Sequence, residues 1–500
     1  MSGQRTRPAG THSTEVLVAG GGLAGLTAAL VLRHHGVAVT VAERRRTTSP
    51  QPKARRLHVR SMEIFRELGL AGLVRDAARG LAGHDHMAAG RTLAEAEQLP
   101  LWLPPGPAGA VSDISPELPC LLAQDALEPL LREAAVAAGA TVCFGTELAG
   151  FGQDAGAVVA HLRDVGTGRR EQVTARYLVA ADGARSAVRE ALGIRRSGHG
   201  IVGGPSVSVY FRADLGDVVR GREFNLCQIE HPSAPGGLAS VDGRLRWVFM
   251  SPGGAAGRDW PALLRTALGV PAPDLEVLSV LPWQAEMRVA DRYSDGRVHL
   301  AGDAAHVMPP FAASGANTGI ADVHNLGWKL AAVLRGDAAP ALLASYDAER
   351  RPAGWFAADQ SSRRTRDLRD LAGGPDPALA HPLVLAAGGF QYPAGALAPA
   401  PAADPEPVTE FSPAGRVGTR IPHRWLDPAR TRSTIDLAGP GWALVTGGPA
   451  QPGAAQLDFL PAGQCLLVRP DHVIAWRGTD PAAASEVRAG LLTLPATRPG

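Results

Sequence analysis

Apolar residues near the start of the chain form two short runs on either side of a longer helical pattern. Residues 16–19 are all apolar, and residues 23–35 are apolar at helical spacing. A second apolar run at residues 37–41 follows Gly36, a residue typical of a helix end. The pattern predicts one βαβ unit over residues 15–43 and therefore a parallel sheet.

The middle of the chain has a different pattern. Residues 200–290 carry short alternating runs, such as 207–212 and 245–250, between glycine and proline turns. Alternation with a period of two is typical of half-buried strands, so we expect a sheet-rich domain inserted into the first α/β domain. Elsewhere the pattern predicts helices at 61–68 and 126–138, strands at 157–181 and 298–301, and a helix after Gly315.

The C-terminal stretch differs again. Residues 393–407 are rich in proline and alanine, which is typical of a linker. Beyond them, residues 443–446, 465–469 and 473–476 have the pattern of strands. We therefore expect a small C-terminal α/β module.

Composition limits the classes of protein to which the chain can belong. With 500 residues it is too long for one ordinary core, so we expect two or three domains. Its 50 basic and 48 acidic residues leave a net charge of +2, which argues against a nucleic-acid binder held by bulk charge. No apolar run reaches the about 20 residues of a membrane span, and the polar start has no signal-peptide core. We expect a soluble, cytoplasmic protein that binds neither nucleic acid nor membrane.

The cysteines give no sign of a disulfide scaffold or a zinc site. Cys120, Cys143, Cys227 and Cys465 lie far apart and have no histidine partners at zinc spacing. This usage suits a reducing compartment, and we expect no metal.

A glycine motif directly follows the first predicted strand. Gly20, Gly22 and Gly25 have the spacing G-x-G-x-x-G and open the predicted helix. In such motifs the first glycine makes a tight turn, the second lets the backbone approach a pyrophosphate, and the third allows close helix packing. Glu43 ends the second strand, where a carboxylate can accept hydrogen bonds from ribose hydroxyls. Together these features predict dinucleotide binding rather than a structural turn.

Two later motifs also follow apolar strands. Asp182 and Gly183, taken alone, are best interpreted as a turn before a helix. Asp303 precedes a stiff loop and a helix start whose positive end would stabilise an electron-rich ring that gains negative charge, such as a flavin. His306 in that loop is interpreted as a structural hydrogen-bonding residue rather than a catalytic base.

Longer motifs follow one another in the order of a known family. They are GGGLAG, PKARRLHVRSMEIFRELGL, LLAQDALEPLL, VAADGARSAVR and GDAAHVMPPFAASGANTGIADVHNLGWKLAAVL. In this order they resemble group A flavoprotein monooxygenases of the para-hydroxybenzoate hydroxylase-like fold, and more closely the aromatic polyketide hydroxylases of actinobacterial antibiotic pathways. The resemblance covers residues 15–355. Residues 415–423 are similar to the thioredoxin-like domain of that subgroup, here without a redox CxxC motif.

The resemblance implies a fold and its division into domains. The class would be α/β: a Rossmann-type, glutathione reductase-like FAD domain, an inserted β-sheet substrate domain and a C-terminal thioredoxin-like α/β domain. The expected bounds are 12–80, 110–198 and 290–392 for the FAD domain, 81–109 and 199–289 for the substrate domain, 393–407 for the linker and 408–500 for the thioredoxin-like domain.

The resemblance also implies residues that hold a non-covalent FAD. Lys53 corresponds to the family's basic residue near the pyrophosphate, Asp303 would bind ribityl hydroxyls, and Pro309 would face the isoalloxazine. The full expected set is Gly20, Gly22, Gly25, Glu43, Arg44, Lys53, Arg55, Gln124, Asp182, Gly302, Asp303, Pro309, Gly315, Ala316 and Asn317.

One departure from the family concerns the segment before Asn317. Where the family has a glycine-rich segment, this chain has Ala312, Ala313, Ser314 and Gly315. The Cβ atoms at 312 and 313 narrow the backbone conformations available there, so the posture of the flavin is open.

The implied reaction has two halves. NADPH or NADH reduces FAD, and a flavin hydroperoxide formed with O2 then hydroxylates an aromatic, polyketide or phenolic substrate. Arg288 could steady a substrate oxygen or form an ordinary salt bridge, and Pro309 completes the expected catalytic set. Trp247, Met250 and Trp283 could line an aromatic pocket or belong to a core.

Several alternatives stay open. Tyr210 and Tyr293 are interpreted as packing residues, so no catalytic base is assigned. The same flavin chemistry could modify an antibiotic or perform a Baeyer–Villiger insertion, and a non-catalytic flavin-binding protein is a remote alternative. A flavin halogenase is disfavoured because its WxWxIP element is missing and the chain has only two lysines, Lys53 and Lys329. Monomer and homodimer are both compatible with the sequence.

Overall fold

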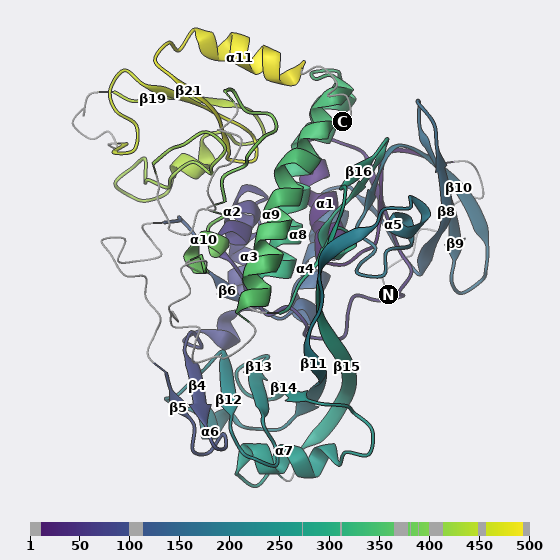
Figure 1. Ribbon diagram of the computed structural model, residues 1–500, viewed down its shortest axis with the longest axis vertical. Coiled ribbons are helices and arrows are strands. Elements are labelled where there is room, and N and C mark those ends of the chain that lie inside the picture. The colour runs from purple at the N-terminus through teal and green to yellow at the C-terminus, as the bar shows by residue number, and fades with distance from the viewer. Residues whose placement is uncertain are drawn as a thin grey trace.

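The computed structural model divides into two sheet domains with a further module beside the upper one (Figure 1). We call them the parallel-sheet domain, the antiparallel-sheet domain and the C-terminal module (described residues 414–493). The structure describes residues 12–99, 114–272, 274–310, 313–364, 379–380, 382–388, 390–399, 414–448 and 457–493.

The parallel-sheet domain begins with the predicted βαβ unit. Strand β1 (His12–Ala19), helix α1 (Leu23–His34) and strand β2 (Val39–Glu43) follow one another, and β1 pairs with β2 in parallel. The sheet has the order β16-β17-β10-β1-β2-β7, with a β8–β9 hairpin added beside β10. Its further strands are β7 (Thr141–Phe144), β8 (Thr146–Gln153), β9 (Val158–Asp164), β10 (Arg170–Ala180), β16 (Ser294–Asp295) and β17 (Val298–Leu300).

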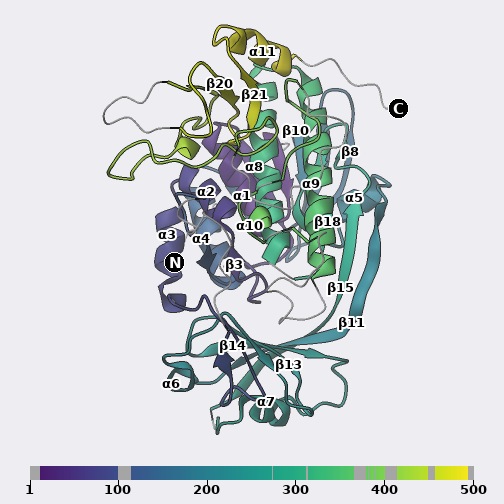
Figure 2. The ribbon, with the colours of Figure 1, turned by 60° about the vertical axis from the view of Figure 1, so that its left-hand side comes forward.

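Helices cover this sheet, and the predicted ones are confirmed. Helices α1, α4 and α8 pack with the buried residues of β1, β2 and β10 in one large core. α8 is followed by α9, which lies against it (Figure 2). The helices are α2 (Val59–Glu67), α3 (Ala71–Ala77), α4 (Gln124–Ala137), α5 (Ala187–Ala191), α8 (Ser314–Arg335), α9 (Ala344–Arg363) and α10 (Pro382–Ala386).

The antiparallel-sheet domain is built on two long strands. β11 (Arg196–Arg212) and β15 (Glu276–Ala290) run side by side from the parallel-sheet domain into the second sheet (Figure 2). That sheet has the order β18-β15-β11-β14-β13-β12-β4-β5, and α7 (Trp260–Leu268) closes one face. Its other elements are β4 (Met87–Gly90), β5 (Glu97–Gln98), β12 (Leu226–Ile229), β13 (Gly236–Ser240), β14 (Arg246–Pro252), β18 (His306–Val307) and α6 (Gly216–Val219).

The C-terminal module contains a three-stranded antiparallel sheet of β19 (Ala443–Thr446), β20 (Cys465–Val468) and β21 (Ile474–Gly478). Helix α11 (Ala483–Leu492) follows it. The predicted strands are confirmed, whereas the thioredoxin-like character of the module stays a prediction.

The described part of the expected linker, residues 393–399, is docked onto the folded protein. Residues 400–407 lie outside the described residues, but Ala396 and Leu397 are buried. The Ala396 amide donates to Glu349 Oε1 at 2.8 Å, and Ala398 forms a β-bridge with Trp476. Composition alone could not reveal this docking, because proline and alanine are equally common in packed loops.

Candidate functional site

The glycine motif forms the expected tight turn at the start of α1. Gly20 has a φ of 103°, and a Cβ there would lie 2.2 Å from the Ala181 carbonyl oxygen. A Cβ on Gly25 would lie 1.9 Å from the Gly20 carbonyl oxygen. A Cβ on Gly22, in contrast, would meet only Glu128 Oε1 at 3.6 Å, and no side chain caps the helix. Gly20 and Gly25 are therefore fixed by protein packing, whereas Gly22 leaves the helix start open to an anion.

Glu43 lies beside this turn. Its Oε2 accepts a hydrogen bond from the Gly21 amide at 2.7 Å, and its Oε1 accepts one from the Arg45 amide at 2.8 Å. The carboxylate is half-buried and holds the strand end to the glycine turn. Arg44, the neighbouring residue of the expected site, has an exposed side chain.

The segment from Lys53 to Arg55 connects the two sheet domains. Arg55 Nη1 donates to the carbonyl oxygens of Asn225 and Ser240 at 3.2 and 2.6 Å. Burial lowers the pKa of the Arg55 guanidinium to about 10, so it is still a cation at neutral pH. Its contacts are thus across the domain boundary, a role that the sequence did not indicate. Lys53 is exposed.

Gln124 begins α4 opposite this segment. Its Oε1 accepts from the Ala54 amide at 3.3 Å, and its Nε2 donates to Glu128 Oε1 at 2.6 Å. Glu128 Oε2 accepts from the Ser49 amide at 2.7 Å. These bonds fix the orientation of the Gln124 amide and leave one of its N–H groups for a ligand.

Two carboxylates follow the ends of neighbouring strands β10 and β17. Asp182 Oδ2 accepts from the Val188 amide at 3.2 Å, but its Oδ1 is buried and has no partner among the described residues. Asp303 is exposed to solvent, yet protein atoms surround it closely enough that burial raises the pKa of its carboxyl group, with Lys53 acting against the rise. The carboxylate is thus open to solvent, although the protein around it disfavours its negative charge.

The start of α8 lies near Asp303 and Pro309. Ala313 precedes the helix with a φ of 52°, a conformation that a residue with a Cβ rarely adopts. Of the two alanines that depart from the family's glycine-rich segment, Ala313 thus carries backbone strain, and residue 312 lies outside the described residues. Pro309 is buried, while Gly315 and Ala316 are partly exposed. The Ser314 hydroxyl is buried and has no partner among the described residues.

Asn317 holds the first turn of α8 to the segment before α2. Its Oδ1 accepts from the His58 amide at 2.8 Å and from Ser61 Oγ at 2.6 Å. Its Nδ2 donates to the carbonyl oxygens of Arg56 and Ala313. The side chain therefore positions the backbone, and only the backbone here is open to a cofactor.

Sequence reasoning missed Asp322, which organises the loop around Gly302. Asp322 Oδ2 accepts from the Gly302 amide at 3.1 Å and from His306 Nε2 at 2.7 Å, and Oδ1 accepts from Arg350 Nε at 2.9 Å. Burial would raise the pKa of Asp322, but the charges of His306 and Arg350 lower it overall. The signal available in the sequence was an aspartate between the apolar residues 320–321 and 323 of the predicted helix. His306 has the structural hydrogen bond that the sequence suggested.

The expected substrate residues lie on opposite faces of the antiparallel sheet. Trp247 is fully buried in the core under α7, and its Nε1 donates to the Ala213 and Arg244 carbonyls. Met250 is half-buried on the face turned to the parallel-sheet domain. Trp247 is thus a core residue, which corrects its expected place in a pocket. Met250 lies three positions further along the strand, and because side chains alternate with a period of two, an odd offset places it on the other face.

Trp283 and Arg288 lie along β15. Trp283 is half-buried, and its Nε1 is buried without a partner among the described residues. Arg288 Nε donates to Glu286 Oε2 at 3.1 Å, and both side chains are 37% exposed. This is the ordinary salt bridge considered from sequence, but β15 pairs with β18 at Arg288 and Val307, close to Pro309.

One described group has the spacing of metal ligands. Glu67 Oε2 lies 2.8 Å from His324 Nε2 and 3.0 Å from His472 Nε2. Arg60 donates to Nδ1 of both rings, at 3.3 and 2.7 Å. Both rings must therefore carry their hydrogen on Nε2 and donate it to Glu67. Histidine ligands usually donate through the other nitrogen, so this arrangement fits a hydrogen-bonded cluster rather than a metal site.

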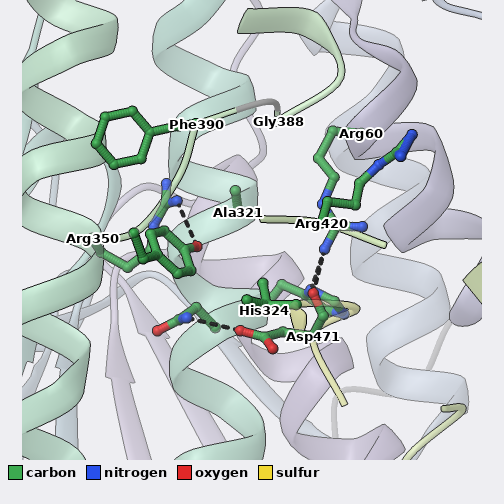
Figure 3. Close-up of a pocket in the computed structure, with 11 residues that line it drawn as sticks. Arg60, Ala321, His324, Arg350, Gly388, Phe390, Arg420 and Asp471 are labelled. Carbon is green, nitrogen blue, oxygen red and sulfur yellow. Dashed lines mark hydrogen bonds between the residues drawn. The ribbon is translucent and has the colours of Figure 1, made fainter. Parts of the chain in front are cut away.

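Beside this cluster lies a small cavity of about 50 Å³ (Figure 3). Arg60 and Arg420 lie on one side of it and Arg350 with Phe390 on the other. Each arginine has a carboxylate partner: Glu63 for Arg60 and Arg420, and Asp322 for Arg350. The cavity thus lies where the C-terminal module contacts α2, α8 and α9, and no residue of the glycine turn lines it.

The residues near the glycine turn fit FAD. Among the described residues, the helix start at Gly22 has no side-chain cap, and Asp182 Oδ1, Ser314 Oγ and the Asp303 carboxylate have no hydrogen-bond partner. Buried polar groups are normally hydrogen-bonded, so a polar ligand is the simplest explanation. No helix in the described part of the chain is long and apolar enough to cross a membrane.

Comparisons with known proteins agree with this geometry. Residues 13–361 match the model of the family described as FAD binding domain. Tetracenomycin B2 monooxygenase-dioxygenase of Streptomyces olivaceus is 41% identical over 92% of this chain and 94% of its own length. Aklavinone 12-hydroxylase of Streptomyces peucetius is 39% identical over 88% of this chain and 93% of its own length.

A similar solved structure extends the comparison to the whole fold. The complex of aklavinone-11 hydroxylase with FAD and aklavinone superposes with a TM-score of 0.82 and 32% identity. The superposition covers 97% of this chain and 99% of that one.

Proposed function

The chain belongs to the FAD-binding domain family and is an FAD-dependent monooxygenase, and on that premise we propose that it hydroxylates a fused-ring aromatic substrate of the polyketide type. NADPH or NADH and O2 are its expected co-substrates. The observation that carries the proposal is the position of one face of the antiparallel sheet, the partly exposed face that carries Tyr210 and Met250 and is opposite to α7. This face adjoins the start of α4 at Ala123 and reaches β18 near Pro309.

The residues of the chain have separate tasks in this proposal. Gly20, Gly22 and Glu43 bind the ADP half of FAD, whereas Gln124 and Asp182 bind the central part of the cofactor. Asp303 binds the ribityl chain through its carboxylate. Lys53 and Arg44 are exposed cations beside the residues that bind FAD, while Arg55 holds the two sheet domains together. When bound, FAD would accept a hydride from the nicotinamide and activate O2 for transfer of one oxygen atom.

The start of α8 provides the electrostatic part of the site. The backbone N–H groups from Gly315 to Asn317 and the positive end of the helix favour negative charge on the reduced ring system. Pro309 stiffens the loop that faces the same region. Arg288 is the nearest candidate for a cation that steadies a substrate oxygen, which requires it to leave Glu286.

Apolar side chains exclude water from the reacting ring. Met250 and Trp283 lie on the sheet face that is turned to the parallel-sheet domain. A dry, shaped site suppresses loss of the activated oxygen to water. We expect a large flat substrate, because the half-exposed face extends over several strands.

An oxygen-labelling experiment tests this function. Purified protein should be yellow with bound FAD, and tetracyclic phenolic polyketides should stimulate its oxidation of NADPH or NADH. The product should gain one oxygen atom that derives from isotopically labelled O2 and not from labelled water. A ring-expanded lactone would instead show the Baeyer–Villiger alternative, and an inactivated antibiotic the modifying one. Bound FAD without any substrate-stimulated oxidation would contradict the proposal and favour the non-catalytic alternative.

The location, the oligomeric state and the character of the C-terminal module are also proposed. We propose a cytoplasmic location, which four free cysteines support. The oligomeric state is proposed as monomer or homodimer. The domain bounds and the thioredoxin-like character of the C-terminal module are likewise kept as predictions.

A further inference from the structure

The face of the antiparallel sheet that is turned to the parallel-sheet domain carries a row of hydroxyl groups. Ser206, Ser208 and Tyr210 alternate along β11, and all three are half-buried. Their side chains point to one side because strand residues two apart share a face. The row therefore lies along the middle strand between β14 and β15.

Apolar side chains flank the row on both sides. On β14, Met250 pairs with Ser208 and Val248 pairs with Tyr210. On β15, Leu281 pairs with Ser208, and Trp283 pairs with Ser206. Directly paired residues of antiparallel strands share a face. Ser279, which pairs with Tyr210 and bonds to Gln51, is a polar exception at the other end. The face thus has a polar centre with apolar margins beside Ser206 and Ser208.

The opposite face of the same strands is entirely different. Val207, Val209 and Phe211 are 0% exposed and belong to the core under α7. Serine is a weaker strand former than valine, so nothing about the strand itself requires Ser206 and Ser208. The strand thus alternates between a packed apolar face and a partly open face, and the open face carries the hydroxyls.

The row makes few hydrogen bonds to the rest of the described protein. Within the described part of the chain, neither Ser206 nor Ser208 has a side-chain hydrogen bond. The Tyr210 hydroxyl accepts from Arg246 Nη1 at 3.4 Å, which leaves its own hydrogen to donate. Arg246 is held in turn by Asp125 at 2.8 Å and Asp242 at 3.0 Å. One end of the row is therefore anchored, and the rest is available to a ligand.

The row lies between two parts of the expected flavin site. Near one end, Tyr210 packs in a small cluster with Ala123, the residue before Gln124. Beyond Ser206, β11 and β15 continue to the parallel-sheet domain, where β15 pairs with β18 beside Pro309. A flat molecule on this face would have its long axis along the row.

We propose that Ser206, Ser208 and Tyr210 bind the oxygen substituents along one edge of a fused-ring aromatic substrate and so determine which ring carbon faces the flavin. The inference rests on the proposed function and adds the residues that set its position of attack. A hydroxyl group both donates and accepts, so the row can bind a quinone oxygen, a phenol or a phenolate. The unpartnered Trp283 indole nitrogen provides one more donor at the Ser206 end.

Paired probes measure this recognition apart from turnover. The FAD-loaded enzyme is titrated with 1,8-dihydroxyanthraquinone and with unsubstituted anthraquinone, and binding is followed by the flavin absorption band. In Ser208→Ala the Kd for the dihydroxy probe should rise about fivefold, as for loss of one hydrogen bond, with less than about twofold change for anthraquinone. Ser206→Ala and Tyr210→Phe should show the same selectivity for the oxygenated probe.

A serine on the other face provides the matched control. Ser251 pairs with Val207 on the closed face, and its hydroxyl accepts from Arg258 at 3.0 Å. Ser251→Ala should leave both Kd values and the FAD content unchanged. In turnover of a polyketide substrate, Ser208→Ala should give a mixture of hydroxylation positions where the wild type gives one.

Three results would overturn the inference. Equal weakening of both probes would indicate a general change of shape, and no weakening of either would show that the hydroxyls do not bind oxygen. Failure of the wild-type holoenzyme to bind the dihydroxy probe more tightly than anthraquinone would have the same meaning. None of these results touches the proposed function, which fails only if no aromatic substrate gains an oxygen atom from O2.

Discussion

Two polar regions of this molecule have opposite character. Where the C-terminal module meets α2, α8 and α9, each buried lysine and arginine has a carboxylate partner. Lys329 Nζ lies 2.7 Å from Glu349 Oε2, and Arg469 makes two bonds of 2.7 Å to the same carboxylate. The carboxylates Glu63, Asp322, Glu349 and Asp471 pair with the cations Arg60, Lys329, Arg350, Arg420 and Arg469, whereas Glu67 accepts from His324 and His472.

Around the expected flavin and substrate site, in contrast, several buried polar atoms are unpaired within the described part of the chain. Asp182 Oδ1, the Ser314 hydroxyl and the Trp283 indole nitrogen are buried without partners among the described residues. An unpaired buried polar group lowers stability by roughly 1–3 kcal/mol. Groups of this kind persist where a ligand completes them. The contrast indicates that the first region stabilises the fold and the second region binds cofactor and substrate.

The largest effect should come from the glycine turn, where packing and ligand binding can be separated. Gly25→Ala places a Cβ 1.9 Å from the Gly20 oxygen, so we expect little soluble folded protein. Gly22→Ala meets only Glu128 at 3.6 Å, so the protein should fold but bind FAD at least about tenfold more weakly. Circular dichroism and FAD titration measure the two effects. Normal FAD affinity in Gly22→Ala would contradict the expected path of the pyrophosphate.

At the paired interface, removal of one carboxylate should destabilise the whole protein. Glu349→Ala leaves Lys329 and Arg469 buried with fewer partners, which should lower the free energy of unfolding by about 3–5 kcal/mol. Urea unfolding measures this change. Asp217→Ala, which removes an exposed ion pair with Arg220, is the control and should change stability by less than about 1 kcal/mol. Equal effects of the two variants would contradict the contrast between buried and surface charges.

Acid should weaken the paired interface first. Burial would raise the pKa values of Glu63 and Glu349, but Arg420 lowers the first and Arg469 and Lys329 lower the second overall. A carboxyl group whose pKa is lowered by folding stabilises the protein at pH values above its pKa in the unfolded chain, about 4.3. This stabilisation is lost as the pH falls through the pKa of the group in the folded protein. When urea unfolding is measured at a series of pH values from 6 downward, the urea midpoint should therefore begin to decline at about pH 4. In Glu349→Gln the midpoint should start lower and decline less over the same range.

A smaller effect is expected at the strained start of α8. Ala313 has a φ of 52°, which glycine adopts without a steric penalty. Ala313→Gly should therefore raise the unfolding free energy of the apoprotein by up to about 1 kcal/mol. Ala332→Gly, inside the same helix at ordinary helical geometry, should lower it by a similar amount. A loss of stability in Ala313→Gly would show that the strain is compensated by packing.

Local features were predictable from the sequence. The turn, helix and strand around Gly20 depend on residues within one short segment, and their spacing carries the information. It was also predictable that Trp247 and Met250 lie on opposite faces of their strand, because side chains at an odd offset in a strand point to opposite sides.

Long-range pairing was not predictable in the same way. Glu349 and Arg469 are far apart in the chain, and neither residue has a local pattern that identifies the other. The role of Arg55 at the domain boundary likewise depends on carbonyl groups of Asn225 and Ser240 in the other domain. The docking of Leu397 depends on tertiary contacts that composition does not contain.

The most direct test of the contrast is an FAD titration of Asp303→Asn together with urea unfolding of its apoprotein. Burial raises the pKa of Asp303, so its charge destabilises the apoprotein fully above the folded-state value, and this penalty vanishes below about pH 3.9. At neutral pH the variant should be at least as stable as the wild type while its Kd for FAD rises about tenfold or more. Unchanged FAD affinity combined with a less stable apoprotein would contradict the account.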